Sequence, residues 1–291
     1  MGLFHRHRGL TPYLLLTPGL LWLGIFFLLP LGFLAYQSLQ SGSIDFGYAF
    51  TWSWGNYWHA IRDYHGHFIR SFEYAAIATL IALVVSYPVA YWIAFHGGRW
   101  KNLLLLGIVA PFFVTYLIRT LAWETILSDN GFVVRTLGQL HLLGILGQDG
   151  HLLSTGTAVV AGITYNFLPF MALPLYVSLE QIDARLIEAA EDLYASKWHA
   201  FWRVTFPLSL PGVVAGTLLT FIPAAGDFIN AELLGSTNNH MIGNVIQSKF
   251  LQLTDYPAAA AMSFILMGGI LVAVFLYARV VGTEQLTGTA A

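Results

Sequence analysis

The sequence predicts an all-α polytopic membrane protein, a bundle of six transmembrane helices. Hydrophobic residues make up 57% of the 291-residue chain and charged residues only 10%, well below the roughly 25% of a soluble domain. Long runs without Asp, Glu, Lys or Arg recur along the chain, and about 20 such residues cross a bilayer. The net charge of -2 gives no indication of nucleic acid as a partner. The chain has no cysteine, which excludes disulfides and thiolate metal sites.

Six apolar runs define the expected helices, because a helix rises 1.5 Å per residue and must cross roughly 30 Å. The first run follows the basic stretch HRHR, but its length and internal prolines are not typical of a signal peptide. A further apolar piece, Thr136–Gln148, is too short to cross, so we expect it to be interfacial or re-entrant. We expect residues 1–291 to form one transmembrane domain with spans near 12–38, 70–95, 103–127, 157–180, 211–232 and 257–280.

The distribution of Lys and Arg predicts the orientation, since these residues resist translocation. With the N-terminus inside, the cytoplasmic pieces contain Arg6, Arg8, Arg99, Lys101, Arg185, Lys197, Arg203 and Arg279. The outer pieces contain only Arg62, Arg70, Arg135 and Lys249. We therefore expect both termini in the cytoplasm, together with the loop 182–210 between the fourth and fifth spans.

That loop is charged and amphipathic. Asp183 is placed to cap a helix from about Ala184 to Leu193, and Ser196 to cap a second helix over Lys197–Phe206, which Pro207 is expected to end. Small side chains in the first helix allow close approach of another surface. The alternative is a loop that rests on lipid headgroups.

The stretch EAAEDLYASKWHAFWRVTFPLSLPG (188–212) resembles the EAA motif of ABC importer permeases. Where that family has Gly, six residues after the Glu, this chain has Tyr194, so the turn either adopts negative φ or gains contacts in a partner's groove. The resemblance implies a type I permease bundle whose loop docks on a separate ATP-binding subunit. The residues it implicates in ATPase coupling are Glu188, Ala189, Ala190, Asp192, Leu193, Tyr194 and Pro207.

Four further segments resemble the first permease subunit of spermidine/putrescine importers: LIRTLAWETIL (117–127), AAGDFINAELLG (224–235), MIGNVIQSKFL (241–251) and DYPAAAAMSF (255–264). The resemblance implies a polyamine substrate, a second homologous permease subunit, two ATP-binding subunits, an extracytoplasmic solute-binding protein and a bacterial inner membrane location. It implies no enzymatic activity and no cofactor in this chain. ATP and Mg would be bound by the ATPase, since no lysine here follows a glycine as in a P-loop. Alternatives are a permease for iron, thiamine or an amino acid-like solute, and an ion-coupled secondary transporter.

Ionisable residues within the spans predict a path for a polycation. Counted along straight helices, Arg119 and Asp227 lie at a common depth, about 24 Å from the inner face. Asp227 either contacts substrate or neutralises Arg119 as a structural ion pair. The other substrate-path candidates are carboxylates near the outer mouth, aromatic rings for cation-π contact and one mid-span amide: Glu73, Glu124, Glu232, Tyr116, Trp123, Tyr165 and Asn166.

These candidates also have plainer interpretations. The three glutamates can be ordinary interfacial residues, and the aromatic residues a membrane belt. In the outer loop 40–68, His59, His65 and His67 lack a clear fourth ligand, so we predict no metal site. Docking of the solute-binding protein is the preferred role of this loop.

Overall fold

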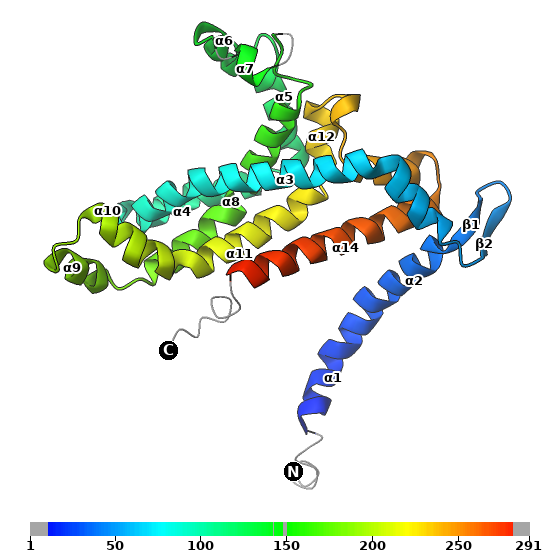
Figure 1. Ribbon diagram of the computed structural model, residues 1–291, viewed down its shortest axis with the longest axis horizontal. Coiled ribbons are helices and arrows are strands. Elements are labelled where there is room, and N and C mark those ends of the chain that lie inside the picture. Colours follow the sequence, from blue (N-terminus) through cyan, green and yellow to red (C-terminus); the bar gives the residue numbers. More distant parts are fainter. Residues whose placement is uncertain (1–10, 142, 148–149, 282–291) are drawn as a thin grey trace. The chain divides into compact units, whose positions relative to one another are not determined.

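The computed structural model describes residues 11–141, 143–147 and 150–281 (Figure 1). The chain divides into two compact units. The first combines the residues up to Asp63 with Ile246–Ile265, and the second combines Tyr64–Val245 with the residues from Leu266 onward.

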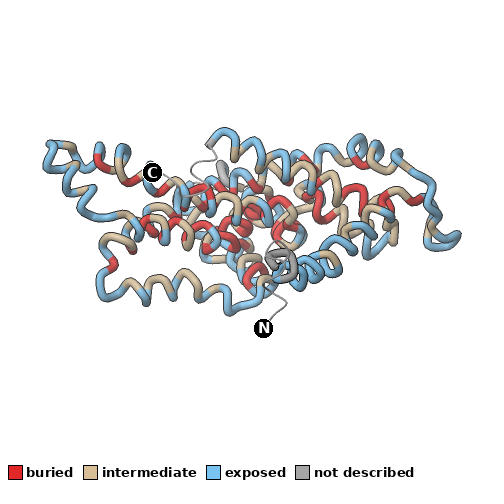
Figure 2. Tube along the Cα trace, turned by 90° about the horizontal axis from the view of Figure 1, so that it is seen from below, coloured by how far each residue is buried: buried red, intermediate tan, exposed pale blue. Residues whose placement is uncertain are grey.

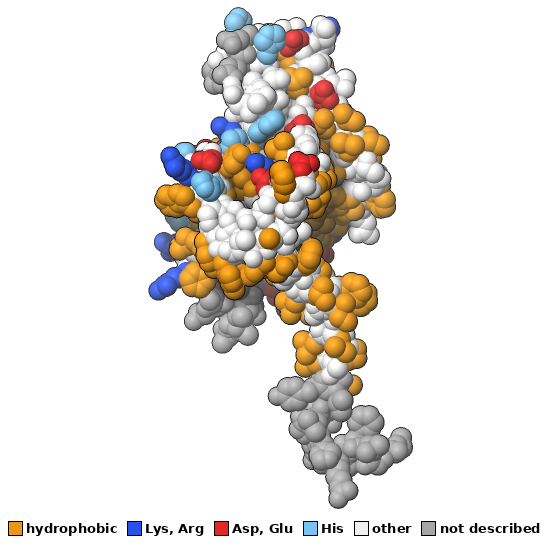
Figure 3. Space-filling model, turned by 90° about the vertical axis from the view of Figure 1, so that its right-hand side faces the viewer, with side chains coloured by type: hydrophobic (Ala, Val, Ile, Leu, Met, Phe, Trp, Pro, Cys, Tyr) orange, Lys and Arg blue, Asp and Glu red, His pale blue; other side chains and the backbone are white. Residues whose placement is uncertain are grey.

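The first unit contains an apolar helix and a small hairpin. Helix α1 (Thr11–Leu23), a π turn (Gly24–Leu28) and α2 (Leu29–Ser38) run on continuously, and Figure 3 shows hydrophobic side chains along them. Strands β1 (Gln40–Ser43) and β2 (Gly47–Phe50) pair antiparallel, with Gln40 opposite Phe50. This hairpin is a departure from the predicted all-helical chain. Gly42 and Gly47 allow it because both have positive φ, at 129° and 82°.

In the smaller unit, the π turn Ser248–Gln252 precedes the start of α14 (Tyr256–Val281). Lys249 Nζ lies 3.1 Å from Asp255 Oδ2, and the Tyr48 hydroxyl donates to the Thr254 carbonyl. The Tyr48 bond joins the hairpin to the turn before α14, and the Lys249–Asp255 contact joins the π turn to the residue that precedes α14.

The larger unit is a helical bundle that contains the long helices of the chain. Helix α3 runs from Gly55 to His96, and its part from Tyr64 onward belongs to this unit. Most of α14 belongs to it as well. The remaining helices are α4 (Lys101–Val109), α5 (Tyr116–Leu127), α6 (Phe132–Gln139), α7 (Leu143–Leu146), α8 (Gly156–Glu180), α9 (Ala184–Asp192), α10 (Lys197–Ala200), α11 (Phe206–Ala225), α12 (Ile229–Leu234) and α13 (Ile242–Gln247). Short 3-10 turns lie at Gly98–Trp100, Ala110–Phe113 and Thr237–Asn239.

Helices α8 and α11 form the centre of this bundle, and Figure 2 shows buried residues along its middle. Small residues let the two helices approach closely. A Cβ added at Gly212 would lie 2.7 Å from the Pro174 carbonyl oxygen, and one at Gly216 would lie 2.8 Å from Met171 Sδ. Such close small-residue contacts are a general means of helix association in membranes.

The polytopic all-α fold is confirmed. Within the described residues, five helices are long and apolar enough to cross a membrane, and six if the bent pair Gly98–Phe113 and Tyr116–Gln139 counts as one span. Helices α6 and α7 cover much of Thr136–Gln148, whose interfacial position stays a prediction.

Two expected spans are broken rather than straight. The pair that forms the third span bends by 96°, where a 3-10 turn containing Pro111 is followed by extended residues at Val114 and Thr115. In the fifth expected span, helix α11 ends at Ala225, and α12 starts only at Ile229. Depths counted along straight helices therefore do not apply beyond either break.

The expected helix end at Pro207 is also wrong. Lys197–Ala225 is one helical stretch, in which the π turn Phe201–Thr205 joins α10 to α11. The Phe206 N–H bonds to the Phe201 carbonyl five residues back. Pro207 follows in the first turn of α11, where a missing N–H is tolerated.

Candidate functional site

The segment α9–α10 lies at one end of the α8/α11 pair, beyond Glu180 and before Phe206 (Figure 1). Both predicted caps are present. The Arg185 N–H donates to Asp183 Oδ1 at 3.0 Å, and the His199 N–H donates to Ser196 Oγ at 3.4 Å. Side chains therefore satisfy amides at the start of each short helix, which fixes where the chain turns.

Tyr194 adopts the conformation for which glycine is usual. Its φ is 63°, its N–H bonds to the Glu191 carbonyl, and the Ala195 N–H bonds to the Ala190 carbonyl. This pair of bonds is the Schellman arrangement that closes a helix with a left-handed residue. The turn is therefore not remodelled, and Tyr194 carries about 1 to 2 kcal/mol of strain.

Most of the coupling residues are open to solvent. Glu188, Ala189, Asp192 and Pro207 are exposed, and Ala190 is half-buried. Leu193 is 82% and Tyr194 99% exposed. Within the described chain, no ion pair engages Glu188 or Asp192. The segment thus presents acidic, small and apolar side chains outward together.

A buried polar cluster joins the two broken spans. Asp227 Oδ2 accepts from the Tyr116 hydroxyl at 2.7 Å and from Asn230 Nδ2 at 2.5 Å. Asp227 Oδ1 accepts from the Ile229 and Asn230 N–H groups at 2.9 and 3.4 Å. This carboxylate therefore satisfies the backbone donors left free where α12 begins, as a helix break in a membrane requires.

The cluster continues onto α5 and α8 through amide and hydroxyl groups. Asn230 Oδ1 accepts from Thr120 Oγ1 at 3.3 Å and from Asn166 Nδ2 at 3.2 Å. Asn166 is only 1% exposed. Its Nδ2 is engaged inside the protein, whereas its Oδ1 has no hydrogen-bond partner among the described residues. Contact of this amide with substrate stays a prediction.

The structure forms no ion pair between Arg119 and Asp227. Among the described residues, the hydrogen bond made by the Arg119 guanidinium is a long one, 3.5 Å from Nη1 to the Asn166 carbonyl oxygen. The guanidinium lies 5.6 Å from the ring centroid of Tyr116 and 5.9 Å from that of Phe112. Asp227 is occupied by neutral donors instead, so the structural-pair hypothesis fails in this conformation.

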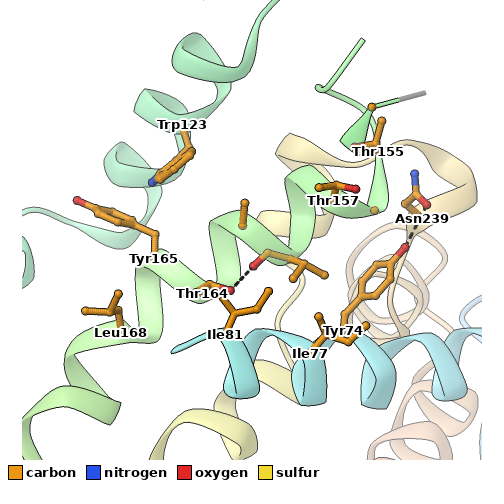
Figure 4. A pocket seen from close by; sticks show the side chains of 14 residues that line it. Tyr74, Ile77, Ile81, Trp123, Thr155, Thr157, Thr164, Tyr165, Leu168 and Asn239 are labelled. Atoms are coloured by element: carbon orange, nitrogen blue, oxygen red, sulfur yellow. Dashed lines mark hydrogen bonds between the residues drawn. The ribbon is translucent and has the colours of Figure 1, made fainter. Parts of the chain in front are cut away.

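A cavity of about 850 Å³ lies between α3, α5 and α8 (Figure 4). The ring centroids of Trp123 and Tyr165 lie 5.4 Å apart, and the ring planes are tilted by 59°. Tyr74 lies across the cavity and donates to Asn239 Oδ1 at 3.2 Å. The other lining residues are small, hydroxylic or aliphatic: Ile77, Ile81, Gly147, Thr155, Gly156, Thr157, Val160, Ala161, Thr164 and Leu168.

None of the described residues that line this cavity is charged. The predicted carboxylates lie outside it: Glu73 is exposed on α3, Glu124 is half-buried on α5, and Glu232 is exposed on α12. Glu232 Oε2 accepts from Asn244 Nδ2 at 3.0 Å and lies 3.8 Å from His240 Nε2. Trp123 and Tyr165 were predicted from the sequence as substrate-path residues, but Tyr74 and Asn239 were not. Tyr74 and Asn239 are far apart in the sequence, so no local pattern indicates that they line the same cavity.

A family model described as "Binding-protein-dependent transport system inner membrane component" matches residues 82–282. The chain belongs to this family. The spermidine/putrescine transport system permease protein PotB of Haemophilus influenzae is 37% identical over 260 residues, which cover 89% of this chain and 90% of that protein. PotB of Salmonella typhi is 41% identical over 198 residues, 68% of each chain.

Solved structures resemble the fold. A bacterial alginate ABC transporter in complex with an alginate pentasaccharide-bound periplasmic protein matches with a TM-score of 0.70 at 18% identity, covering 100% of this chain and 99% of that chain. The MetNI methionine ABC transporter matches with a TM-score of 0.55 at 16% identity, covering 79% of this chain and 99% of that chain. The predicted family is confirmed: the protein is a multi-pass permease subunit of an ABC importer, and not an enzyme.

Proposed function

We propose that this permease moves a polyamine such as spermidine or putrescine across the bacterial inner membrane. The observation that carries the proposal is the 37% identity, over 89% of the chain, to a permease named for spermidine and putrescine transport.

The cavity suits the chemistry of a polyamine in transit. A polyamine alternates ammonium groups with short methylene segments, and the cavity lining combines aromatic rings with threonine hydroxyls and aliphatic side chains (Figure 4). A cation over an aromatic ring gains about 0.5 to 2 kcal/mol. Such aromatic faces are available on Tyr74, Trp123 and Tyr165. A buried carboxylate would bind the cation too tightly, since a transported ion must also leave its site.

In this proposal the carboxylates outside the cavity act before the substrate enters it. Glu73, Glu124 and Glu232 attract the polycation toward the outer mouth before it reaches the aromatic lining. Glu73 and Glu232 are exposed and Glu124 is half-buried, which supports the role because side chains open to solvent can meet a solute before it enters the cavity.

The α9–α10 segment is proposed to dock on a separate ATP-binding subunit that holds ATP and Mg. In the full transporter, two such subunits, a second homologous permease and an extracytoplasmic solute-binding protein complete the assembly. Both termini and α9–α10 then lie in the cytoplasm. The outward display of Leu193 and Tyr194 supports this, since such large apolar side chains usually mark an interaction site.

The test is uptake of labelled spermidine into proteoliposomes that hold the complete transporter and its binding protein. We expect ATP-dependent uptake that unlabelled putrescine inhibits and alginate does not. Tyr165→Leu should reduce uptake at subsaturating substrate by about 3- to 30-fold, whereas Tyr165→Phe should retain most of it. Tyr277→Leu, on α14 outside the cavity, is the matched control. Absence of ATP-dependent polyamine uptake by the unaltered transporter would refute the proposal.

A further inference from the structure

Arg119 is the most unusual charge in the structure, because it is buried without a counter-ion. Only 9% of the residue is exposed. Among the described residues, its Nε has no hydrogen-bond partner and no carboxylate lies within 4.0 Å of its guanidinium. An arginine within a membrane segment is costly unless it is paired or reaches water, so such a residue usually marks a functional contact.

A second cavity lies against this guanidinium. It has a volume of about 310 Å³ and is lined by Val114, Ile118, Arg119, Ala122, Trp123, Ile126 and Tyr165. Arg119 is the one charged member of this lining, and the rest is almost wholly apolar. The cavity therefore has one buried positive charge among apolar side chains. This combination is suited to an acidic side chain that is surrounded by apolar residues on the surface of a partner.

The helix face around the cavity is uncovered. Ile118 is 57% exposed, and Leu117, Leu121 and Ile126 on the same helix are also exposed. Lipid alone can cover such aliphatic side chains, but acyl chains cannot satisfy the guanidinium. The unmet donor thus favours a protein partner over lipid at this face.

The proposed substrate is excluded from this cavity because its charge is positive, like that of Arg119. A polyammonium ion gains nothing from a buried guanidinium and would be repelled by it. Trp123 and Tyr165 line both cavities, so the same aromatic pair faces the neutral cavity and the Arg119 cavity. Helix α5 therefore has two faces: one lines the uncharged cavity proposed for substrate, and the other lines the Arg119 cavity proposed for a protein partner.

We propose that a membrane-embedded Asp or Glu of the second permease subunit pairs with Arg119, and that the exposed face of α5 around Ile118 is its docking surface. The inference rests on the proposed pairing with a second permease. The new contact is a charge-assisted bond that forms only on assembly, because the described chain supplies Arg119 with no acid. Arg119 is a positioning residue here, not a substrate ligand.

The first test uses Arg119→Glu in the complete transporter, with the matched charge reversal Arg135→Glu at an exposed position on α6 as the control. We expect Arg119→Glu to lower co-purification of the second permease at least about tenfold, and Arg135→Glu to leave it unchanged. Single reversals to Arg are then made at each carboxylate in the apolar segments of the second permease. One reversal should restore co-purification with Arg119→Glu. Failure of every such reversal would overturn the proposal.

The second test separates assembly from misfolding. In the chain purified alone, Arg119→Met should keep or raise the unfolding midpoint, because it replaces an unpaired buried charge with a shorter, flexible apolar side chain. In the complex it should weaken co-purification. A chain destabilised alone, or a complex unaffected by Arg119→Met, would show that Arg119 is satisfied within its own subunit.

A third measurement maps the surface directly. A photo-cross-linking p-benzoylphenylalanine at Ile118 should form an adduct with the second permease, and adducts with lipid only would overturn the docking surface. If these tests fail while the unaltered transporter still takes up spermidine with ATP, the proposed function stands and only the Arg119 contact is lost.

Discussion

Replacing Asp227 tests whether the buried cluster, rather than a pair with Arg119, accounts for this carboxylate. Asp227 is 7% exposed and accepts from the Tyr116 hydroxyl, the Asn230 side chain and two backbone N–H groups. Asp227→Ala would leave all of these donors without their acceptor. A buried donor left unsatisfied costs about 1 to 3 kcal/mol, and relaxation recovers part of the sum. We therefore expect a loss of about 3 to 5 kcal/mol in the free energy of unfolding.

Asp227→Asn provides a graded comparison. Its Oδ1 can still accept from the two backbone N–H groups, but its amide nitrogen now faces the Asn230 amide, donor against donor. Asn230 is held in its orientation by Thr120 and Asn166, which donate to its Oδ1. The expected loss is about 1 to 2 kcal/mol, between wild type and Asp227→Ala.

The assay is unfolding of the purified chain in mixed detergent micelles, followed by far-UV circular dichroism. Asp129→Ala is the control, since Asp129 is exposed and bonds to an exposed His151, and we expect it to change stability by less than about 0.5 kcal/mol. Equal stabilities for Asp227→Ala and this control would refute the reasoning. So would a coupling energy above about 2 kcal/mol between Arg119→Met and Asp227→Ala, because that would indicate an ion pair.

Four further predictions concern coupling, substrate entry and packing. Glu188→Lys should uncouple ATPase activity from transport without changing membrane insertion, and unchanged uptake in vesicles would contradict this. Glu232→Gln should lower polyamine uptake at subsaturating substrate, and equal initial rates would count against a role for this carboxylate. Tyr194→Gly should relieve up to about 1 to 2 kcal/mol of turn strain while weakening ATPase binding, measured by hydrogen exchange at Ala195 and by pull-down. Gly216→Leu should destabilise the chain by about 1 to 3 kcal/mol because its side chain would collide with Met171, and an unchanged unfolding midpoint would argue against close α8–α11 packing.

The fold class and the local caps could be predicted from sequence because both depend on short-range patterns. Apolar runs indicate spans through their length, and Asp183 and Ser196 sit directly before the helices that they cap. At Pro207 the local pattern predicted a helix end, and the helix continues instead. A π turn upstream lets the helix continue, and nothing in the residue types alone indicates that turn.

The helix breaks were less predictable because proline has no single outcome in a membrane helix. Pro88 and Pro169 lie inside unbroken helices, whereas Pro111 precedes a 96° bend. Neighbouring helices decide which outcome is tolerated, since they must satisfy the freed backbone groups.

The residues of the polar cluster and the cavity were only partly predictable, because neighbouring helices also decide how these side chains are paired. The polar residues within apolar runs were visible, but their partners depend on tertiary packing. Tyr116 and Asn230, rather than Arg119, engage Asp227. The aromatic pair Trp123 and Tyr165 lines the cavity and the three glutamates do not, and contact of these residues with substrate stays a prediction.

The central claim is that α9–α10 is a cytoplasmic contact for an ATP-binding subunit, and a cysteine at Tyr194 tests it most directly. The chain has no native cysteine, so Tyr194→Cys supplies a unique thiol at a 99% exposed position. We predict that in the assembled transporter this thiol cross-links to the ATP-binding subunit and is protected from a membrane-impermeant maleimide applied outside intact cells. Labelling from outside, or no cross-link to the ATP-binding subunit in the purified complex, would contradict the account.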